Sequence, residues 1–292
     1  MLKGRLGIDT ARVPQADRHG VLWLGRGNVV VDAGTLRFVT AGSDTFVAGD
    51  YAIPFQGVSC LALEPGTTVS HDALRLCARH GTGVVVVGEG GVRLYASMPF
   101  GPDRSARARK QVEHWADPHL KTWVARRMYA WRLGEIVPDA DLTVLRGIEG
   151  ARMRAHYQRL SEMYGIHWRG RRYDRQAPDA ADFANQAINH AATAMYALGQ
   201  VAVAVTGCIP QLGFIHEESG IAFALDIADM FRTEITLRIA FDAVRKPRRP
   251  DETLERVVRK HAATVFRRDK VVATMIDRIK ELFGVDDPGD HP

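Results

Sequence analysis

Two aspartates in the second half of the chain are the residues best suited to chemistry. Asp226 and Asp229 stand three positions apart in the strongly apolar stretch Leu225–Asp229. On a helix both carboxylates project from one face, about one turn apart. Two negative charges in a segment that otherwise favours burial are costly unless a positive group neutralises them. Oxygen ligands suit Mg²⁺ and Mn²⁺, so we favour a divalent cation that satisfies both carboxylates.

A local ion pair is the competing interpretation. Arg232 follows Asp229 by three positions and is within reach of its carboxylate. Asp226, by contrast, has no basic residue three or four positions away on either side. The ion pair therefore explains one aspartate and leaves the other without a partner.

Two further candidates come from other segments. His216 lies in the loop Phe214–Gly220, ten positions before Asp226, where it can reach whatever the aspartate helix presents. A loop histidine alone is weak evidence, because most are simply solvated. With a glutamate on a third segment, these residues would form a site of three or four ligands with open positions. Catalytic magnesium and manganese sites take this form when phosphate and water complete the shell.

Glu149 is the candidate glutamate, and it lies on a separate predicted helix. Arg146 and Arg152, three positions to either side, offer it a purely structural role as an ion-pair partner. Gly147 and Gly150 flank it, and each costs a helix up to ~1 kcal/mol relative to alanine. That cost indicates that something approaches the helix backbone closely at this point.

Two weaker motifs have competing explanations. The run Gly88–Gly91 could cradle a phosphate, but it precedes a strand and lacks the Gly-Lys-Ser/Thr ending, so we predict a hairpin turn. The cluster Trp168–Tyr173 interleaves aromatic residues with arginines. Such a loop suits splayed DNA, where bases stack and guanidinium groups hold phosphates. An exposed basic loop without function is the alternative.

The elements that position these residues fall into two parts of different character. Residues 1–98 predict a small sheet domain with one helix, which begins after Ser70 and ends at Gly81. The predicted strands are Val29–Val31, Leu36–Thr40, Ser59–Leu63, Val84–Val87 and Val92–Ala96. The turn Glu89–Gly91 joins the last two as a hairpin.

Helical patterns dominate after the Pro/Gly cluster at Met98–Pro102, which indicates a linker over residues 99–104. We expect a helical catalytic domain over residues 105–284 and a short tail over 285–292. The predicted helices are Pro118–Leu133, Leu142–Tyr164, Asp182–Val205, Ala222–Arg245, Asp251–Phe266 and Lys270–Phe283. The predicted fold class is α+β.

Positive charge is concentrated in three windows. The formal net charge is +5, yet residues 101–132, 146–175 and 241–270 each carry five more basic than acidic residues. Arginine dominates these windows, and its planar fork suits phosphate. A phosphate-rich partner follows naturally, although arginines that only keep a helix surface soluble explain the same charge.

The remaining composition bounds the class of protein. Cys60, Cys77 and Cys208 are too few and too widely spaced for a disulfide framework or a zinc site, and we expect buried reduced thiols. No apolar run approaches the ~18 residues that span a bilayer, and no signal-peptide pattern opens the chain. We expect a cytoplasmic protein without a membrane partner.

These residues together resemble the CRISPR-associated integrase family, the first of the Cas adaptation proteins, in its subtype I-E branch. Seven segments match in family order. They are Leu63–Thr67 with Val69–His71, Gly91–Ser97, Arg146–Gly150, Gly170–Asp174, Asn185–Gln186, Gly213–His216 and Asp226–Asp229. Any one of them is weak evidence, but seven in order from about residue 15 to 270 are specific.

The resemblance implies an N-terminal β domain and a C-terminal helical domain that binds one Mg²⁺ or Mn²⁺. It assigns Glu149, His216 and Asp229 as metal ligands and Asp226 as a residue that supports them. Basic positions that contact DNA in the family correspond to Arg75, Arg93, Arg171, Arg232 and Arg259.

Two departures from the family pattern stand out. Arg26 occupies the position of a base-stacking tyrosine, so its contact with the fork of the incoming DNA is expected to differ. The sequence also lacks the longer Pro-rich tail that relatives use against their partner subunit, so we expect docking through other surfaces.

The implied activity is that of a metal-dependent endonuclease and integrase in spacer acquisition. A 3′-hydroxyl of a foreign DNA fragment attacks a phosphodiester at the CRISPR repeat, and a repeat 3′-hydroxyl leaves. The implied partners are double-stranded and splayed DNA, a second copy of the chain, and a small ferredoxin-like second adaptation subunit.

Two rival functions remain at this level. A non-catalytic DNA-binding scaffold would use the acidic cluster only for structure. A helical magnesium-dependent diphosphate enzyme also places aspartates three positions apart on a helix. That enzyme would need a second aspartate-rich helix and an apolar chain pocket, and the sequence indicates neither.

Overall fold

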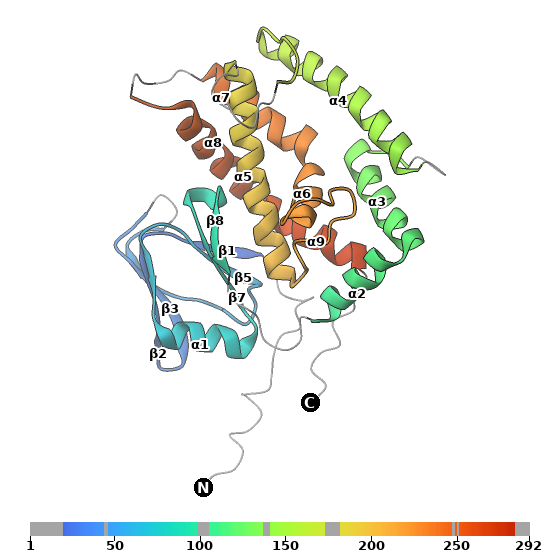
Figure 1. Ribbon diagram of the computed structural model, residues 1–292. Coiled ribbons are helices and arrows are strands. Elements are labelled where there is room, and N and C mark those ends of the chain that lie inside the picture. The colour runs from blue at the N-terminus through green and yellow to red at the C-terminus, as the bar shows by residue number, and fades with distance from the viewer. Residues whose placement is uncertain are drawn as a thin grey trace.

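The computed structural model describes residues 20–43, 46–97, 105–136, 141–172, 182–246, 249 and 251–283. A part built from strands lies beside a part built from helices, which confirms the predicted α+β class (Figure 1). The predicted linker at 99–104 and tail at 285–292 lie outside the described residues. No helix within the described ranges is long and apolar enough to cross a bilayer.

The strand part holds two four-stranded sheets rather than the one sheet expected. The first has the order β1 (Val21–Leu24), β5 (Cys60–Leu63), β7 (Gly83–Val87), β8 (Leu94–Ser97). The second has the order β4 (Gly49–Ala52), β3 (Thr35–Thr40), β2 (Gly27–Asp32), β6 (Thr67–Val69). Strands β1, β5 and β7 run parallel, whereas β2, β3 and β4 form an antiparallel meander. The added strands β1, β4 and β6 have three or four residues each, too short for a clear apolar pattern.

The single helix of this part, α1 (His71–His80), begins and ends as predicted. Ser70 caps its first turn through its side-chain oxygen, and Gly81 closes it in the left-handed conformation. The apolar face of α1 buries Ala73 and Cys77 against residues of both sheets, including Phe38 and Leu61. All three cysteines are buried and form no disulfide, as expected.

The hairpin between β7 and β8 is confirmed as a turn. Glu89–Gly91 forms one turn of 3₁₀-helix, closed by the bond from the Gly88 amide to the Arg93 carbonyl at 2.8 Å. Gly90 has a φ of 66° and lies directly against α8 (Leu254–Arg268). A Cβ at this position would lie 1.8 Å from the Cβ of Ala263, so only glycine permits this contact.

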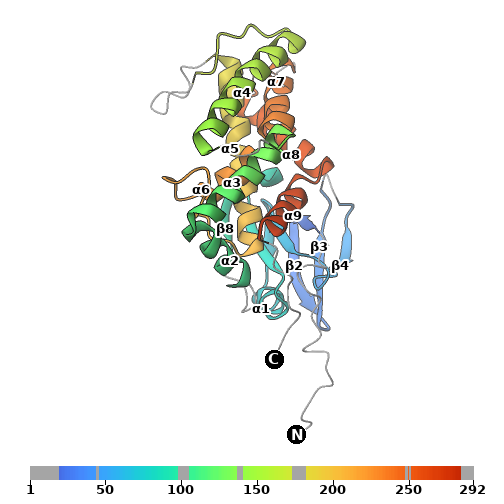
Figure 2. The same ribbon diagram turned by 90° about the vertical axis from the view of Figure 1, so that its right-hand side faces the viewer.

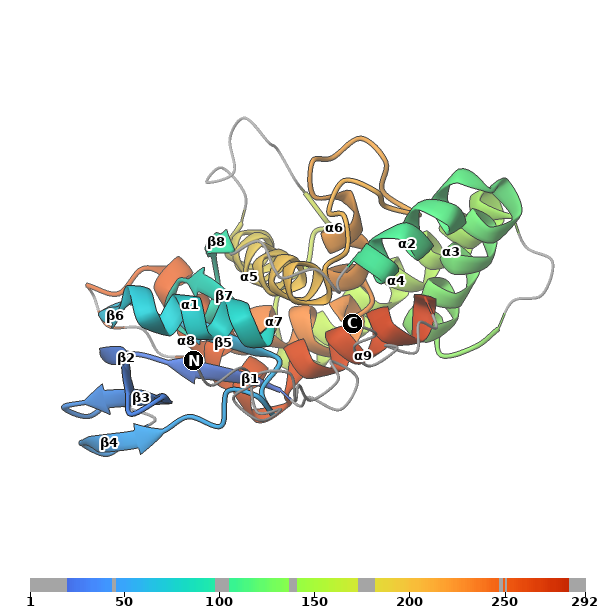
Figure 3. The same ribbon diagram turned by 90° about the horizontal axis from the view of Figure 1, so that it is seen from below.

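The helical part surrounds one buried helix, α5 (Phe183–Thr206). Figures 2 and 3 show α5 between the strands and the other helices. Those helices are α2 (Ser105–Ala116), α3 (Pro118–Leu133), α4 (Leu142–Tyr164), α6 (Ala222–Asp229), α7 (Leu237–Arg245), α8 and α9 (Val271–Phe283). Alanine is frequent along α5, and small side chains allow neighbouring backbones to approach closely. Gly199 shows this best, since a Cβ there would lie 2.6 Å from the Ala224 carbonyl of α6.

One hydrophobic core runs through both parts. It contains Ala62 and Val85 of the first sheet together with Leu198 of α5 and Phe266 of α8. The first sheet and its hairpin therefore pack on α5 and α8, and the strands support the helical part directly.

The prediction of one continuous helix over Ala222–Arg245 is wrong in the middle of that range. Helix α6 ends at Asp229, and a π-helical turn over Arg232–Thr236 precedes α7. The Thr236 amide bonds the Phe231 carbonyl, five positions back, and this wider spacing defines the π turn. Neither glycine nor proline marks the break, so the sequence pattern is continuous across it. The interruption places Asp229 at the end of a helix.

Candidate metal centre

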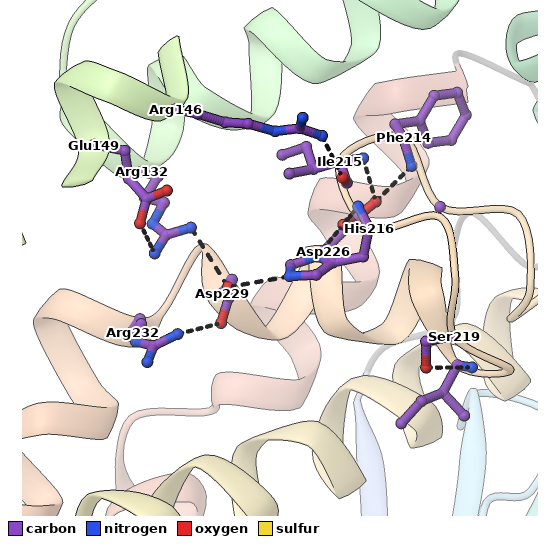
Figure 4. A network of polar contacts seen from close by, with 12 residues as sticks. Arg132, Arg146, Glu149, Phe214, Ile215, His216, Ser219, Asp226, Asp229 and Arg232 are labelled. Carbon is purple, nitrogen blue, oxygen red and sulfur yellow. Dashed lines mark hydrogen bonds and ion pairs between the residues drawn. The ribbon is translucent and has the colours of Figure 1, made fainter. Parts of the chain in front are cut away.

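Three segments bring the candidate ligands together. Helix α4 carries Glu149, helix α6 carries Asp226 and Asp229, and the loop after α5 carries His216 (Figure 4). Helix α3 adds Arg132, which the sequence analysis did not single out. The side chains converge on one side of α6.

Asp226 is satisfied entirely by the loop before it. Its Oδ2 accepts the amides of Phe214 at 2.6 Å and Ile215 at 3.0 Å, and its Oδ1 accepts the amide of His216 at 2.9 Å. The Nδ1–H of His216 donates to the same Oδ1 at 2.7 Å. The expectation that one cation neutralises both aspartates is therefore wrong for Asp226, because backbone and imidazole N–H groups already occupy its two oxygens. This arrangement is that of a residue that supports the site.

A tight turn at Gly213 makes this arrangement possible. A Cβ on Gly213 would lie 2.1 Å from the His216 carbonyl oxygen and 2.8 Å from the Ala222 Cβ. Only glycine lets the loop fold back this closely, and the fold-back directs the next three amides towards Asp226.

His216 is oriented by Asp226 and faces Asp229. Its Nε2 lies 3.8 Å from Oδ2 of Asp229, at the second aspartate of the motif. The hydrogen bond that His216 donates to Asp226 raises the pKa of His216 above its usual value, although burial acts in the opposite direction. A carboxylate that fixes one imidazole nitrogen while the other faces a second acidic residue is typical of histidine metal ligands.

Arg132 is the positive group closest to Glu149. Its Nη2 lies 2.6 Å from Oε1 of Glu149, and its Nη1 lies 3.5 Å from Oδ2 of Asp229. The expected pairing of Glu149 with Arg146 or Arg152 is wrong. Those arginines donate instead to the carbonyls of Ile215 and Leu133. Nothing in the sequence around Arg132 separates it from the neighbouring arginines of α3.

The donor set fits a small divalent cation in its chemistry. Two carboxylates and one imidazole are the ligand types that Mg²⁺ and Mn²⁺ accept. Within the described residues no three acidic, histidine or cysteine side chains stand close enough to hold an ion as they are. The reason is visible in Figure 4, where the Arg132 guanidinium lies between Glu149 and Asp229. No atom of the described ranges lies within 4 Å of a Cβ built on Gly147 of the same helix, so those residues make no close approach to the backbone there.

Two further predicted arginines lie at this end of the site, Arg232 against Asp229 and Arg171 near Arg232. Arg232 forms the predicted ion pair, with its Nη1 3.4 Å from Oδ1 of Asp229. Burial alone would lower the pKa of Arg232, but the Asp229 carboxylate and nearby tyrosine hydroxyls raise it overall. Arg171 donates to the side chains of Asn185 and Asn189. Burial lowers the pKa of Arg171, and the positive charge of Arg232 acts in the same direction.

Trp168 is not available as a stacking platform. Its ring stacks on Tyr157 at a centroid distance of 5.1 Å and an interplanar angle of 16°, and it also packs on Phe241. The interpretation that this residue stacks on bases is therefore wrong. The other aromatic residue of that cluster, Tyr173, lies outside the described residues.

A second group of predicted DNA contacts gathers where the two parts of the molecule meet. Arg93 of the hairpin and Arg259 of α8 both pair with Glu255, at 3.1 and 3.6 Å. Beside them lies a cavity of about 660 Å³. Its lining includes Arg256, which the sequence analysis missed although it stands one helical turn before Arg259.

The last two predicted contacts lie on the strand part. Arg75 is exposed on α1 and pairs with Asp72. Arg26 is exposed and has a φ of 57°, an uncommon conformation for a residue with a side chain. It lines a cavity of about 120 Å³ that shares Pro65 and Glu89 with the larger one. The predicted arginines thus occupy three locations.

Comparison with known proteins gives one consistent family. The family model described as CRISPR associated protein Cas1 matches residues 130–275. The chain is 37% identical to the CRISPR-associated endonuclease Cas1 of Escherichia coli (strain K12), over 92% of this chain and 86% of that protein. A protein of the same name from Geobacter sulfurreducens is also 37% identical, over 96% of this chain and 90% of the relative.

Solved structures show the same fold. A crystal structure of a TtCas1–DNA complex is similar at a TM-score of 0.81 and 34% identity, over 93% of this chain and 99% of that chain. A casposase bound to its integration product is similar at a TM-score of 0.59 and 14% identity, over 94% and 99%. At that identity the second match concerns the fold alone.

Proposed function

The chain belongs to the Cas1 family of CRISPR-associated proteins, and on this premise we propose that it is a metal-dependent DNA endonuclease and integrase of CRISPR adaptation. In the proposed reaction a 3′-hydroxyl of a foreign fragment attacks a phosphodiester at the repeat. One ester bond replaces another, so the reaction requires no nucleoside triphosphate. The subtype I-E assignment is part of the proposal.

One observation carries the proposal. The three amides of Phe214–His216 and the His216 imidazole all bind Asp226, and they leave the other imidazole nitrogen facing Asp229. A purely structural acidic cluster gains nothing from an imidazole held in this orientation, whereas a metal ligand needs it.

Glu149, His216 and Asp229 are the residues that would hold Mg²⁺ or Mn²⁺. A cation there would supply charge neutralisation at the phosphate oxygens and orient the attacking hydroxyl. Asp226 acts through His216 and keeps its ring in place. Arg132 and Arg232 border the same carboxylates, so their positive charge would also attract the phosphodiester.

DNA is the proposed substrate, in double-stranded and splayed form. The similar TtCas1 was solved in complex with DNA, and basic residues here line the two adjoining cavities of the strand part and α8. A homodimer and a small ferredoxin-like second adaptation subunit complete the proposal, and they rest on the family resemblance.

Strand transfer by ligand variants tests the proposal. Asp229→Ala and His216→Ala are expected to abolish joining of a short duplex to a CRISPR plasmid in Mg²⁺ or Mn²⁺, with DNA affinity largely retained. Asp277→Ala, which removes an exposed carboxylate of α9, is the control and should join normally. Normal joining by either ligand variant would remove the mutated residue from the proposed mechanism.

A further inference from the structure

The loop that presents His216 is held from outside by helix α2, which precedes it by about a hundred residues. The side chain of Gln111 is fully buried, and its amide group makes three hydrogen bonds to this loop. Its Nε2 donates to the carbonyls of Ile209 and Leu212, both at 2.9 Å. Its Oε1 accepts the Ile209 amide at 2.7 Å.

Trp115 continues the same contact one helical turn later. Its indole Nε1–H donates to the Gly213 carbonyl at 2.9 Å. Gly213 is the residue whose tight turn directs the next three amides towards Asp226. Residues four positions apart on one face of α2 therefore bond the backbone up to the position where the Asp226 contacts begin.

The loop is also held on the far side of His216. Lys121 lies 3.2 Å from Glu217, and the same ammonium stands 4.8 Å from the centre of the Trp115 ring. Trp115 thus holds the loop on both sides of His216. Its N–H bonds Gly213 before the histidine, and its ring contacts the Lys121 that pairs with Glu217 after it.

We propose that Gln111 and Trp115 are positioning residues, which fix the loop so that its amides and the His216 ring meet Asp226 in one geometry. Neither residue touches the carboxylates of the site. Their effect passes through the loop backbone, so losing them should loosen the Phe214–His216 amides without opening the rest of the fold. The catalytic consequence rests on the proposed function, but the loosening does not.

The charge-neutral change Trp115→Phe is the sharpest test. Phenylalanine keeps an aromatic ring for Lys121, but it removes the N–H donor together with part of the indole. Trp123→Phe is the matched control, since this tryptophan is similarly exposed on the next helix and contacts His114 and Arg127 instead of the loop. Gln111→Met provides a second variant of similar shape without the amide.

Hydrogen exchange of the full chain in EDTA gives the first readout. We expect Trp115→Phe to speed exchange of the Phe214, Ile215 and His216 amides by about tenfold, a factor equivalent to ~1.4 kcal/mol. Amides of α5 should exchange as in the parent, as should all three loop amides in Trp123→Phe. Gln111→Met should show a larger change at the same amides. If that variant does not fold, Trp115→Phe decides alone.

Joining kinetics give the second readout. At saturating DNA, Trp115→Phe should lower the joining rate several-fold while KM for DNA stays at the parent value. Unchanged exchange at the three loop amides in Trp115→Phe would overturn the proposal. If the parent protein joins no DNA, the proposed function fails, and the exchange comparison still decides whether α2 positions the loop.

Discussion

Arg132 bonds Glu149 across two helices, with 2.6 Å between Nη2 and Oε1, and its side chain is only 5% exposed. The same guanidinium reaches Asp229, so it links two of the three proposed metal ligands. In the metal-free protein this arginine offsets the repulsion between two carboxylates that lie largely out of water. A cation bound by both would have to take its place between them.

Replacing Arg132 should therefore destabilise the metal-free protein. Breaking a buried ion pair by removing one partner costs about 3–5 kcal/mol, and we expect Arg132→Met to lose about that much in urea unfolding with EDTA. Mn²⁺ should restore part of the loss, since a ligand at 100 times its Kd contributes ~2.7 kcal/mol. Arg127→Met, a more exposed position on the same helix, is the control. Equal losses with and without Mn²⁺ would contradict a shared site.

The pH dependence of stability should show the bond between Asp226 and His216. The pKa of His216 is raised in the folded state, so its stabilising contribution is complete below the unfolded value of about 6.5. It is lost as the pH rises through the higher folded pKa. The charged groups that face the ring are Asp226, Asp229 and Arg132.

The measurement is the difference in the free energy of unfolding between the parent and His216→Gln in EDTA. This difference should shrink from pH 6 to pH 8. His156→Gln should show the opposite dependence on pH, because burial and the charge of Arg159 lower the pKa of His156. The stabilising effect of neutral His156 is lost as the pH falls through its folded pKa. If the differences for His216→Gln and for His156→Gln changed with pH in the same direction, the assigned directions of the two pKa shifts would be refuted.

DNA binding should weaken steeply with salt. Each arginine–phosphate contact releases counterions and adds about 0.9 to the slope of log affinity against log salt. Arg93→Glu and Arg259→Glu should each reduce that slope by roughly one contact, because Arg259 lines the cavity at the junction and Arg93 pairs with the same Glu255. Arg268→Glu, on the same helix as Arg259, should leave the slope unchanged. A slope near zero in the parent would rule out a DNA track.

Arg26 is expected to hold the fork of the incoming DNA mainly through phosphate, with less stacking than an aromatic ring gives. In a competition between splayed and blunt fragments, Arg26→Tyr should keep the preference for splayed ends. Arg26→Ala should lose that preference, but its φ of 57° also strains alanine. Arg26→Asn tolerates the left-handed backbone and separates the two causes. Parental preference in both Ala and Asn variants would exclude Arg26 from fork recognition.

Most helices could be predicted because their ends carry strong local signals. Asp117, Asp141 and Asp182 cap α3, α4 and α5 with their side chains, and glycines close all three. Short edge strands and the break after Asp229 could not be predicted, since each depends on contacts with distant segments. Propensity gives no information on such contacts.

The sequence predicted which residues belong to the candidate site, but it did not predict which groups they bind. The spacing of Asp226 and Asp229 indicated a shared face, and that is where both lie. The identity of their partners was not accessible. Asp226 is satisfied by backbone amides of a loop, and Glu149 by an arginine seventeen positions upstream on another helix. Both partnerships arise from tertiary packing.

The contact between Gly90 and Ala263 also constrains how the chain is made. The hairpin leaves the ribosome early, while the alanine that covers it is synthesised near the end. At about 5–20 residues per second, the interval is roughly 10 to 35 s. Val85 and Val92 belong to the core that α8 helps to form. During that interval they lack the cover that α8 provides. A nascent chain of this protein is thus a candidate client for chaperones that bind apolar strands, until α8 emerges and closes over the hairpin.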